Sequence, residues 1–511
     1  MEEKNETLQK GVYSKSVHGG KWFLLGNILQ KILNIAPFLI LARLLMPEDY
    51  GVIAVVFMLT SALDRFATPG FGTALLQRKG SVEEYIDTIW TYDLIKSFLI
   101  AIIIFVFGGV AANFFHVSQD YILIIRLSGL LTIITALSNP RQLYFFKDLD
   151  FKKVFIRDLV GQIAYVFVAL GWALLVSATA WALFFGYIAR YIAGILITYI
   201  MLPGLPKLSF QFRKLKDLLG YGKWIYGQQI MDYLLGFLDN ILVGRMLGQT
   251  ALGLYSRARD LPTTISWPLL NIMNKIAFPA YSKLQDERGK IQQGFLKSLD
   301  LLLLVTIPFS LLLLVEGGSI VSVFLGAKWM SIVLPLKILA VANIFSSLTM
   351  MQKPIFNAIG KPKINFNVNI LQLVIFSLAI YFGIQYKGLP GAAMALTLGW
   401  AILLCYVVIQ MRPILRIGWD KLMPIIIPSF LATTVVFSLA VIFKGYLHHN
   451  FSDIIILVWV VFLGLLYLVI ALFTSKKMSS GPWYTLKAVL QEVGVLKFIA
   501  KKNKKSSKEC I

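Results

Sequence analysis

The chain has 511 residues, of which 58% are hydrophobic and 15% charged, and its mean hydropathy is +0.73. Soluble domains average about 45–50% apolar and about 25% charged residues, so this composition excludes an ordinary soluble protein and indicates an integral membrane protein. The formal net charge is +23, and in a membrane protein such an excess gathers in cytoplasmic loops and does not indicate nucleic-acid binding.

The chain contains about 14 apolar runs that are long enough for a transmembrane helix, which needs about 20 mostly apolar residues. The polar residues 1–21 before the first run, which form the predicted cytoplasmic N-terminus, do not have the pattern of a cleaved signal peptide. The predicted fold is an all-α integral membrane protein. The runs cover residues 22–45, 50–75, 88–110, 121–143, 154–176, 179–202, 218–247, 251–281, 292–315, 332–357, 364–386, 389–411, 422–445 and 453–474.

The connections between these runs predict their orientation, because cytoplasmic loops collect Lys and Arg. Counted from the N-terminus, each odd-numbered connection holds at most one such residue, for example Arg43 or Lys328. Each even-numbered connection holds at least two, as in the loop with Lys152, Lys153 and Arg157. This alternation predicts that both termini lie in the cytoplasm.

An internal repeat equates the first predicted helix with the seventh. The motif Gly-Lys-Trp at 20–22 recurs at 222–224, and at the same offset Gly51 corresponds to Gly253. Each half then has an even number of helices, so both halves have the same orientation. Chance similarity between apolar segments is the alternative. The predicted parts are two pseudo-symmetric six-helix lobes at 22–202 (N-lobe) and 218–411 (C-lobe), a cytoplasmic linker at 203–217, and two further helices within 422–474.

The predicted cytoplasmic tail, residues 475–511, is basic. A helix start at 479–483 precedes a short amphipathic stretch that ends near Ala500. A polybasic segment beside a membrane is attracted to anionic lipid by about 1 kcal/mol per charge. We expect the tail to bind anionic membrane lipids, and a solvated, disordered tail is the alternative. Its last basic residues are Lys501, Lys502, Lys504, Lys505 and Lys508.

Polar and charged side chains follow one face of several predicted helices. Such residues are costly inside a membrane and typically face a water-filled cavity or the protein interior. Cations at several depths suit an anionic cargo such as a phosphate or pyrophosphate group. The cations expected to line a central cavity are Lys31, Arg65, Arg257 and Lys275. The polar residues expected beside them are Asn27, Asn34, Asp64, Gln228, Asp232 and Asp260.

The alternative is that neighbouring aspartates pair with these bases and only tie helices together. For Asp93 and Lys96, three residues apart on one predicted helix, this structural interpretation is favoured. For Lys31, Arg65 and Arg257 we favour contact with the cargo.

Catalytic and metal-binding patterns are weak. The adjacent His448 and His449 lack carboxylates at a suitable spacing, which argues against a metal site. Cys405 lies in an apolar run and Cys510 in the basic tail, so no disulfide framework is indicated. The predicted outer loops are too short for a glycosyltransferase domain, and no nucleotide-binding motif is present. We therefore expect no enzyme activity, no metal and no cofactor.

Three short motifs occur in a fairly specific order and spacing: LARLLMPEDYG at 41–51, GFGTALLQ at 70–77 and YSRARDLP at 255–262. With them the chain resembles, over nearly its whole length, the Wzx-type oligosaccharide flippases. These form the polysaccharide transporter family within the multidrug/oligosaccharidyl-lipid/polysaccharide exporter superfamily. The resemblance is closest to the teichuronic-acid and colanic-acid exporters.

This resemblance implies a V-shaped pair of lobes that alternates between inward and outward openings. The cargo it implies is an undecaprenyl-pyrophosphate-linked oligosaccharide, passed to the outer leaflet of the bacterial cytoplasmic membrane. It places cavity cations on helices 1, 2 and 8, which here carry Lys31, Arg65 and the pair Arg257 and Arg259. It also implies coupling to Na⁺ or H⁺. The candidate residues for coupling are Asp239, Asn369 and Thr397.

We therefore expect a multi-pass flippase for cell-surface polysaccharide biosynthesis. Its expected partners are the lipid-linked oligosaccharide, anionic lipids and polysaccharide-assembly enzymes. Three rival functions stay open, and one of them is a non-transporting scaffold. A cation-coupled multidrug antiporter of the same superfamily favours acidic cavity linings, whereas bases outnumber acids on these helix faces. A membrane glycosyltransferase or ligase needs longer outer loops than the sequence offers.

Overall fold

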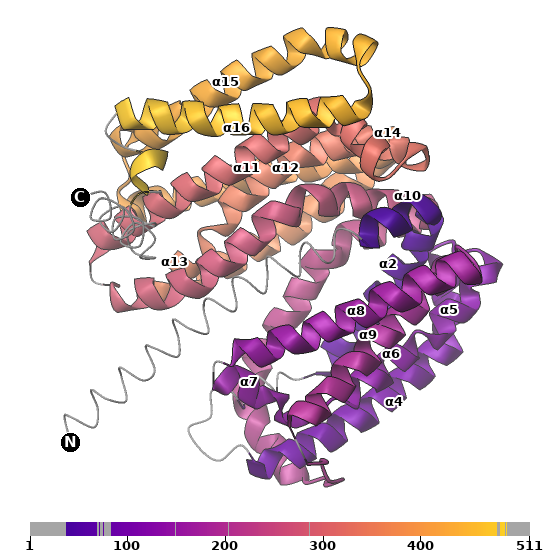
Figure 1. Cartoon of the computed structure of the whole chain (residues 1–511). Helices are drawn as coiled ribbons and strands as arrows, with labels where there is room; N and C mark the ends of the chain where they lie inside the picture. The colour runs from indigo at the N-terminus through magenta and orange to yellow at the C-terminus, as the bar shows by residue number, and fades with distance from the viewer. Residues whose placement is uncertain are drawn as a thin grey trace, which may run out of the picture. The chain divides into compact units, whose positions relative to one another are not determined.

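The structure is a computed structural model, and it describes residues 37–68, 71, 75, 83–148, 150–202, 204–285, 287–477, 481–485 and 487. Within these residues it consists of helices and connecting loops, without strands (Figure 1). Ten helical segments among them are long and apolar enough to cross a membrane. The predicted all-α membrane fold is therefore confirmed.

The helices of the first half are α2 (Pro47–Ala67), α4 (Glu83–Phe114), α5 (Ile122–Leu127), α6 (Gly129–Ala136), α7 (Leu143–Lys147), α8 (Phe151–Leu175), α9 (Ala180–Met201) and α10 (Phe212–Lys283). Those of the second half are α11 (Arg288–Phe324), α12 (Val333–Met350), α13 (Lys353–Ala358), α14 (Pro362–Leu415), α15 (Trp419–Asn450) and α16 (Asp453–Lys477). Short 3₁₀ turns are η1 (Gln119–Tyr121), η2 (Pro140–Gln142) and η3 (Ala327–Ile332).

The two longest helices are interrupted where the sequence predicts loops. In α10, Gly248 leaves the helical conformation with φ 81°, between predicted helices that end at 247 and begin at 251. In α14, Lys387 and Gly388 do so, between predicted ends at 386 and 389. Gly388 has φ 55°, a conformation that glycine adopts at little cost. The total of fourteen helices stays a prediction, because most of the first predicted helix lies outside the described residues.

The internal contacts of the chain divide it into two units, Met1–Ser256 and Arg257–Ile511. The division lies inside α10 and not in the segment 203–217, where the sequence predicts a linker. The reason is that the part of α10 before Arg257 packs on α2: the hydroxyl of Tyr233 donates a 3.0 Å hydrogen bond to the carbonyl oxygen of Met58. The predicted limits of the two lobes stay predictions.

In unit 1, α8 and α9 lie side by side and α4 packs on α5 and α6 (Figure 1). Glycines permit these contacts. A methyl group on Gly129 would lie 2.5 Å from the Cα atom of Ala101, and one on Gly161 would lie 2.8 Å from the carbonyl oxygen of Arg190. Close approach through small residues is typical of helices in membranes, where apolar surface gains little from leaving lipid.

In unit 2, α11 is the central helix and contacts α12, α15 and α16. The hairpin of α15 and α16 buries one side of each helix against α11, with Leu304, Ala432 and Tyr467 in the shared core. The opposite side of α16 is also apolar. There Val458, Val461, Leu465, Val469 and Phe473 are 58–69% exposed. A helix that is apolar all round suits a bilayer, and hydropathy therefore predicts the span but not which side is buried.

Candidate functional site

The motif at 41–51 begins α2, and its Asp49 joins three elements. Asp49 is 1% exposed and accepts hydrogen bonds from the backbone N–H of Met46 (2.8 Å) and from the backbone N–H of Ala180 (2.7 Å), the first residue of α9. The hydroxyl of Tyr121 donates a third bond of 2.8 Å. A carboxylate at a helix N-terminus satisfies free N–H groups and complements the helix dipole. Asp49 does so for two helices at once.

We expect the substitution Tyr121→Phe to remove one of these bonds and to lower the free energy of unfolding by about 1 kcal/mol. Thermal unfolding of the purified protein in detergent measures the loss. Asp49→Ala leaves two N–H groups and one hydroxyl without their acceptor, so its loss should be larger than that of Tyr121→Phe. Equal losses for both variants would contradict the role given to Asp49.

A reciprocal glycine contact joins α2 and α10. A methyl group on Gly253 would overlap the carbonyl oxygen of Pro47, and a methyl group on Gly51 would overlap the carbonyl oxygen of Gln249. The repeat offset that equates Gly51 with Gly253 also equates Pro47 with Gln249. On each of the two repeat-related helix starts, the glycine (Gly51 or Gly253) contacts the carbonyl group of the other helix at the equivalent position, Gln249 or Pro47. We call this contact the glycine crossing.

A polar cluster joins α2 to α4. The ammonium group of Lys96 lies 2.8 Å from Asp64 Oδ1, 2.8 Å from Thr68 Oγ1 and 3.0 Å from Asp93 Oδ1. The Lys96 side chain is only 9% exposed, so it is largely shielded from water between two carboxylates. The structural interpretation of Asp93 and Lys96 is supported by this geometry. Asp64, which the sequence assigns to the cavity, takes part in the same cluster.

Arg65 follows Asp64 at the C-terminal end of α2 and is exposed. Among the residues that the structure describes, no carboxylate forms an ion pair with it. The free carbonyl groups of this helix end are satisfied by tyrosines: Tyr226 donates to Phe66 and Tyr92 to Ala67, each over 2.6 Å. Arg65 is therefore an exposed side chain on a helix end whose carbonyl groups accept these two bonds.

The predicted cations of unit 2 lie on the second part of α10. Arg257 Nη1 is 3.3 Å from Asp260 Oδ2, in a pair whose side chains are 23% and 61% exposed. Arg259, two residues further, is half-buried. An ion pair this exposed contributes about 0–1 kcal/mol.

The other predicted cavity residues are placed in part. Gln228 and Asp232 are exposed on α10. Lys275 lies on the same helix, and its side chain is not among those described. Asn27, Lys31 and Asn34 lie outside the described residues. These assignments stay predictions.

Two of the three candidate coupling residues, Asp239 and Thr397, have hydrogen-bond partners in the structure. Asp239 is 2% exposed and accepts a 3.0 Å hydrogen bond from the hydroxyl of the fully buried Tyr255. The hydroxyl of Thr397 donates to the carbonyl oxygens of Ala393 (2.8 Å) and Ile338 (3.2 Å), so it links α14 to α12. Asn369 is half-buried on α14. Asp239 belongs to unit 1 and the other two to unit 2, and their coupling role stays a prediction.

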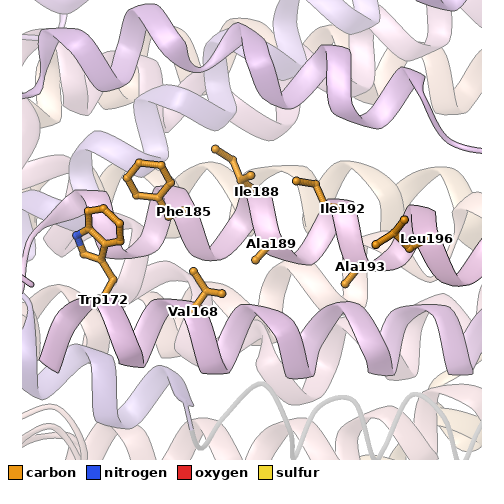
Figure 2. A pocket seen from close by; sticks show the side chains of 8 residues that line it. All are labelled: Val168, Trp172, Phe185, Ile188, Ala189, Ile192, Ala193 and Leu196. Atoms are coloured by element: carbon orange, nitrogen blue, oxygen red, sulfur yellow. The ribbon is translucent and has the colours of Figure 1, made fainter. Parts of the chain in front are cut away.

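A groove of about 410 Å³ runs along α8 and α9. Figure 2 shows its lining: Val168 and Trp172 on α8, and Phe185, Ile188, Ala189, Ile192, Ala193 and Leu196 on α9. The indole N–H of Trp172 is the one polar side-chain group in this lining. The groove thus suits hydrocarbon and offers almost nothing to a glycan or a pyrophosphate.

Several of these features are not predicted by the sequence analysis. Asp49 and Gly51 lie inside a motif used for the resemblance, and the Pro-Glu-Asp order is itself the signal of a helix start. Tyr92, Tyr226 and Tyr233 carry no comparable signal, because their partners are backbone carbonyl groups far away in the sequence. Among the described residues, no group of three or more His, Cys, Asp or Glu side chains could hold a metal ion.

Comparisons with known proteins give three findings. A family model described as "Polysaccharide biosynthesis protein" matches residues 40–334, more than half of the chain. The chain is 24% identical to the lipopolysaccharide biosynthesis protein WzxC of Escherichia coli (strain K12), over 85% of this chain and 89% of that protein. It is 24% identical to the teichuronic acid biosynthesis protein TuaB of Bacillus subtilis (strain 168), over 76% of this chain and 80% of that protein.

The fold is also similar to a solved structure. The lipid II flippase MurJ in an inward closed conformation superposes with a TM-score of 0.65, at 14% sequence identity, over 91% of this chain and 99% of that chain. At this identity the similarity shows a shared fold.

Proposed function

The chain belongs to the polysaccharide biosynthesis protein family, and from this premise we propose that it is a flippase for a lipid-linked oligosaccharide. The family match and the similarity to WzxC and TuaB confirm the resemblance to the polysaccharide exporters. The cargo proposed here is an undecaprenyl-pyrophosphate-linked oligosaccharide, moved from the inner to the outer leaflet of the bacterial cytoplasmic membrane. The observation that carries the proposal is a multi-pass all-α membrane fold shared with a lipid II flippase.

The proposed binding group is the pyrophosphate. Arg65 is exposed at the end of α2 without an ion pair among the described residues, so its guanidinium can donate hydrogen bonds to an anion. Arg257 has a partly exposed ion pair with Asp260, which a doubly charged ligand can displace. Arg259, Lys31 and Lys275 are the further proposed cations. Asp64 also binds the ammonium group of Lys96, and it stays a proposed polar residue of the cavity.

Translocation needs no bond to be made or broken, so we propose a transporter and not an enzyme. The glycan stays in a hydrated cavity, and the prenyl tail stays in the lipid. Alternating access requires that the cargo and a coupling ion bind the two openings with different affinity. We propose Na⁺ or H⁺ as that ion, with Asp239, Asn369 and Thr397 as candidate ligands, and with both chain termini in the cytoplasm. Anionic lipids and polysaccharide-assembly enzymes are the proposed further partners.

Deleting the gene in its host tests the function. We expect surface polysaccharide to be lost while the lipid-linked oligosaccharide accumulates in the cell, because synthesis continues and transport stops. A plasmid with the wild-type gene should restore the surface polymer. If the deletion left the surface polymer intact, or abolished the lipid-linked precursor itself, the flippase assignment would be wrong. The second outcome would favour the rival glycosyltransferase.

A further inference from the structure

Asp300 on α11 is a buried carboxyl group that the proposed transport cycle does not use. It is 1% exposed. Its Oδ2 atom accepts a 2.5 Å hydrogen bond from the hydroxyl of Thr485, whereas Oδ1 is buried and has no hydrogen-bond partner. Within the part of the chain that the structure describes, no Lys or Arg forms an ion pair with it. A lone buried carboxylate is costly unless it carries a proton or holds a cation.

Among the described residues, the groups around Asp300 supply no compensating positive charge. The basic side chains of the surrounding elements lie elsewhere: Lys297 of α11 and Lys487 are exposed, Lys421 of α15 donates to Gln292 (2.6 Å), and Lys476 of α16 lies over the ring of Trp483. The other surroundings are neutral. Tyr467 on α16 and Ser429 on α15 are 0% and 1% exposed, and each carries an uncharged hydroxyl group. An ionised Asp300 would therefore be a solitary charge.

Thr485 belongs to a C-terminal segment, residues 481–485 and 487, that folds back after α16. Gly481 has φ 89°, and a methyl group there would lie 2.7 Å from the carbonyl oxygen of Pro424, so only glycine fits this turn. The backbone N–H of Trp483 donates to Ser475 Oγ over 2.9 Å. Pro482 and Thr485 are buried, whereas Tyr484 is 42% exposed. The segment is thus docked on α11, α15 and α16, and Asp300 is its polar anchor.

We propose that Asp300 is a proton-binding site and that its protonation keeps the C-terminal segment docked. The proton comes from water on the side of the membrane where the segment lies and binds to the carboxylate, giving a neutral carboxyl group that still accepts the Thr485 bond. Loss of the proton leaves a charge that must be hydrated, and hydration requires the segment to move away. The docked state is therefore stable at low pH and is lost as the pH rises. This proposal does not depend on the flippase function.

A spin label at position 484 tests it, in the full-length chain in lipid nanodiscs. The label is introduced by Tyr484→Cys after Cys405→Ser and Cys510→Ser, because Tyr484 is exposed and lies between docked neighbours. Its mobility is measured from about pH 5 to about pH 9, the range in which buried carboxyl groups titrate. We expect an immobilised label at low pH. Above the midpoint, the ratio of mobile to immobile label should rise about tenfold per pH unit, since one proton is released.

Two variants assign the effect to Asp300. Asp300→Asn mimics the protonated acid and can still accept the Thr485 bond, so its label should stay immobilised at every pH. Thr485→Val removes only the hydroxyl, so the ratio of mobile to immobile label should increase about tenfold at a given pH within the transition. If the Asp300→Asn variant does not insert into the membrane, Thr485→Val still tests the proposal. A wild-type label whose mobility is independent of pH would overturn the proposal, as would a pH response that persists in Asp300→Asn.

Discussion

Gly253→Val should reduce polysaccharide export at least tenfold (about 1.4 kcal/mol or more), although the protein still inserts into the membrane. A side chain at this position overlaps the carbonyl oxygen of Pro47 at the glycine crossing, so the starts of α2 and the second part of α10 must move apart. Overpacking of this kind costs about 1–3 kcal/mol. Because the crossing closes the predicted outer ends of two repeat-related helices, the strain should favour the outward opening and stall the cycle. Export is measured as surface polymer in a deletion strain that carries the variant.

The repeat supplies a second variant, and α8 supplies a control. Gly51→Val should have the same effect as Gly253→Val, because Gly51 faces Gln249 as Gly253 faces Pro47. Gly171→Ala places a methyl group where no atom lies within 4 Å, so export should be unchanged. Normal export from both valine variants would show that the glycine crossing can open without affecting transport. The crossing would then have no role in the transport cycle.

Arg65→Glu should abolish export while leaving the amount of protein in the membrane unchanged. Loss of one hydrogen bond to a charged group weakens binding by about 1.5–3 kcal/mol, which is about 10- to 100-fold, and the new carboxylate also repels the pyrophosphate. The fold should be preserved because Arg65 is exposed and has no ion pair among the described residues. Arg257→Glu should act in the same direction, since it places a carboxylate beside Asp260. Surface polymer and immunoblotting of membranes measure the two quantities.

Lys216→Glu is the matched control for charge reversal. Lys216 is an exposed residue near the start of α10, in the same unit as Arg65, and it is not assigned to the cavity. Export from this variant should stay close to the wild-type level. If Arg65→Glu and Arg257→Glu exported as well as Lys216→Glu, the pyrophosphate would be bound elsewhere.

The sequence predicts the membrane spans well because apolar length is a local property. The breaks at Gly248 and Lys387–Gly388 fall where hydropathy and glycine predict loops. The repeat offset, derived from a few residues, is the offset that relates the two sides of the glycine crossing. The division of the chain inside α10 could not be predicted in this way, because it depends on bonds such as that from Tyr233 to Met58. These join helices that are distant in the sequence.

The polar residues show the same limit. Helical spacing alone suggests that Asp93 pairs with Lys96, and the structure places them 3.0 Å apart. The same lysine also binds Asp64 from another helix, which no spacing rule indicates. Asp300 gives no sequence signal either, since its partner Thr485 lies in the C-terminal segment.

Reconstituted vesicles test the central claim most directly. A labelled undecaprenyl-pyrophosphate-linked oligosaccharide is placed in the inner leaflet, and an enzyme that cleaves the glycan is added outside, with Na⁺ or proton gradients imposed in both directions. Vesicles with the wild-type protein should lose the protection of their glycan, whereas vesicles with Arg65→Glu or without protein should keep it. Continued protection with the wild-type protein under every gradient would contradict the account.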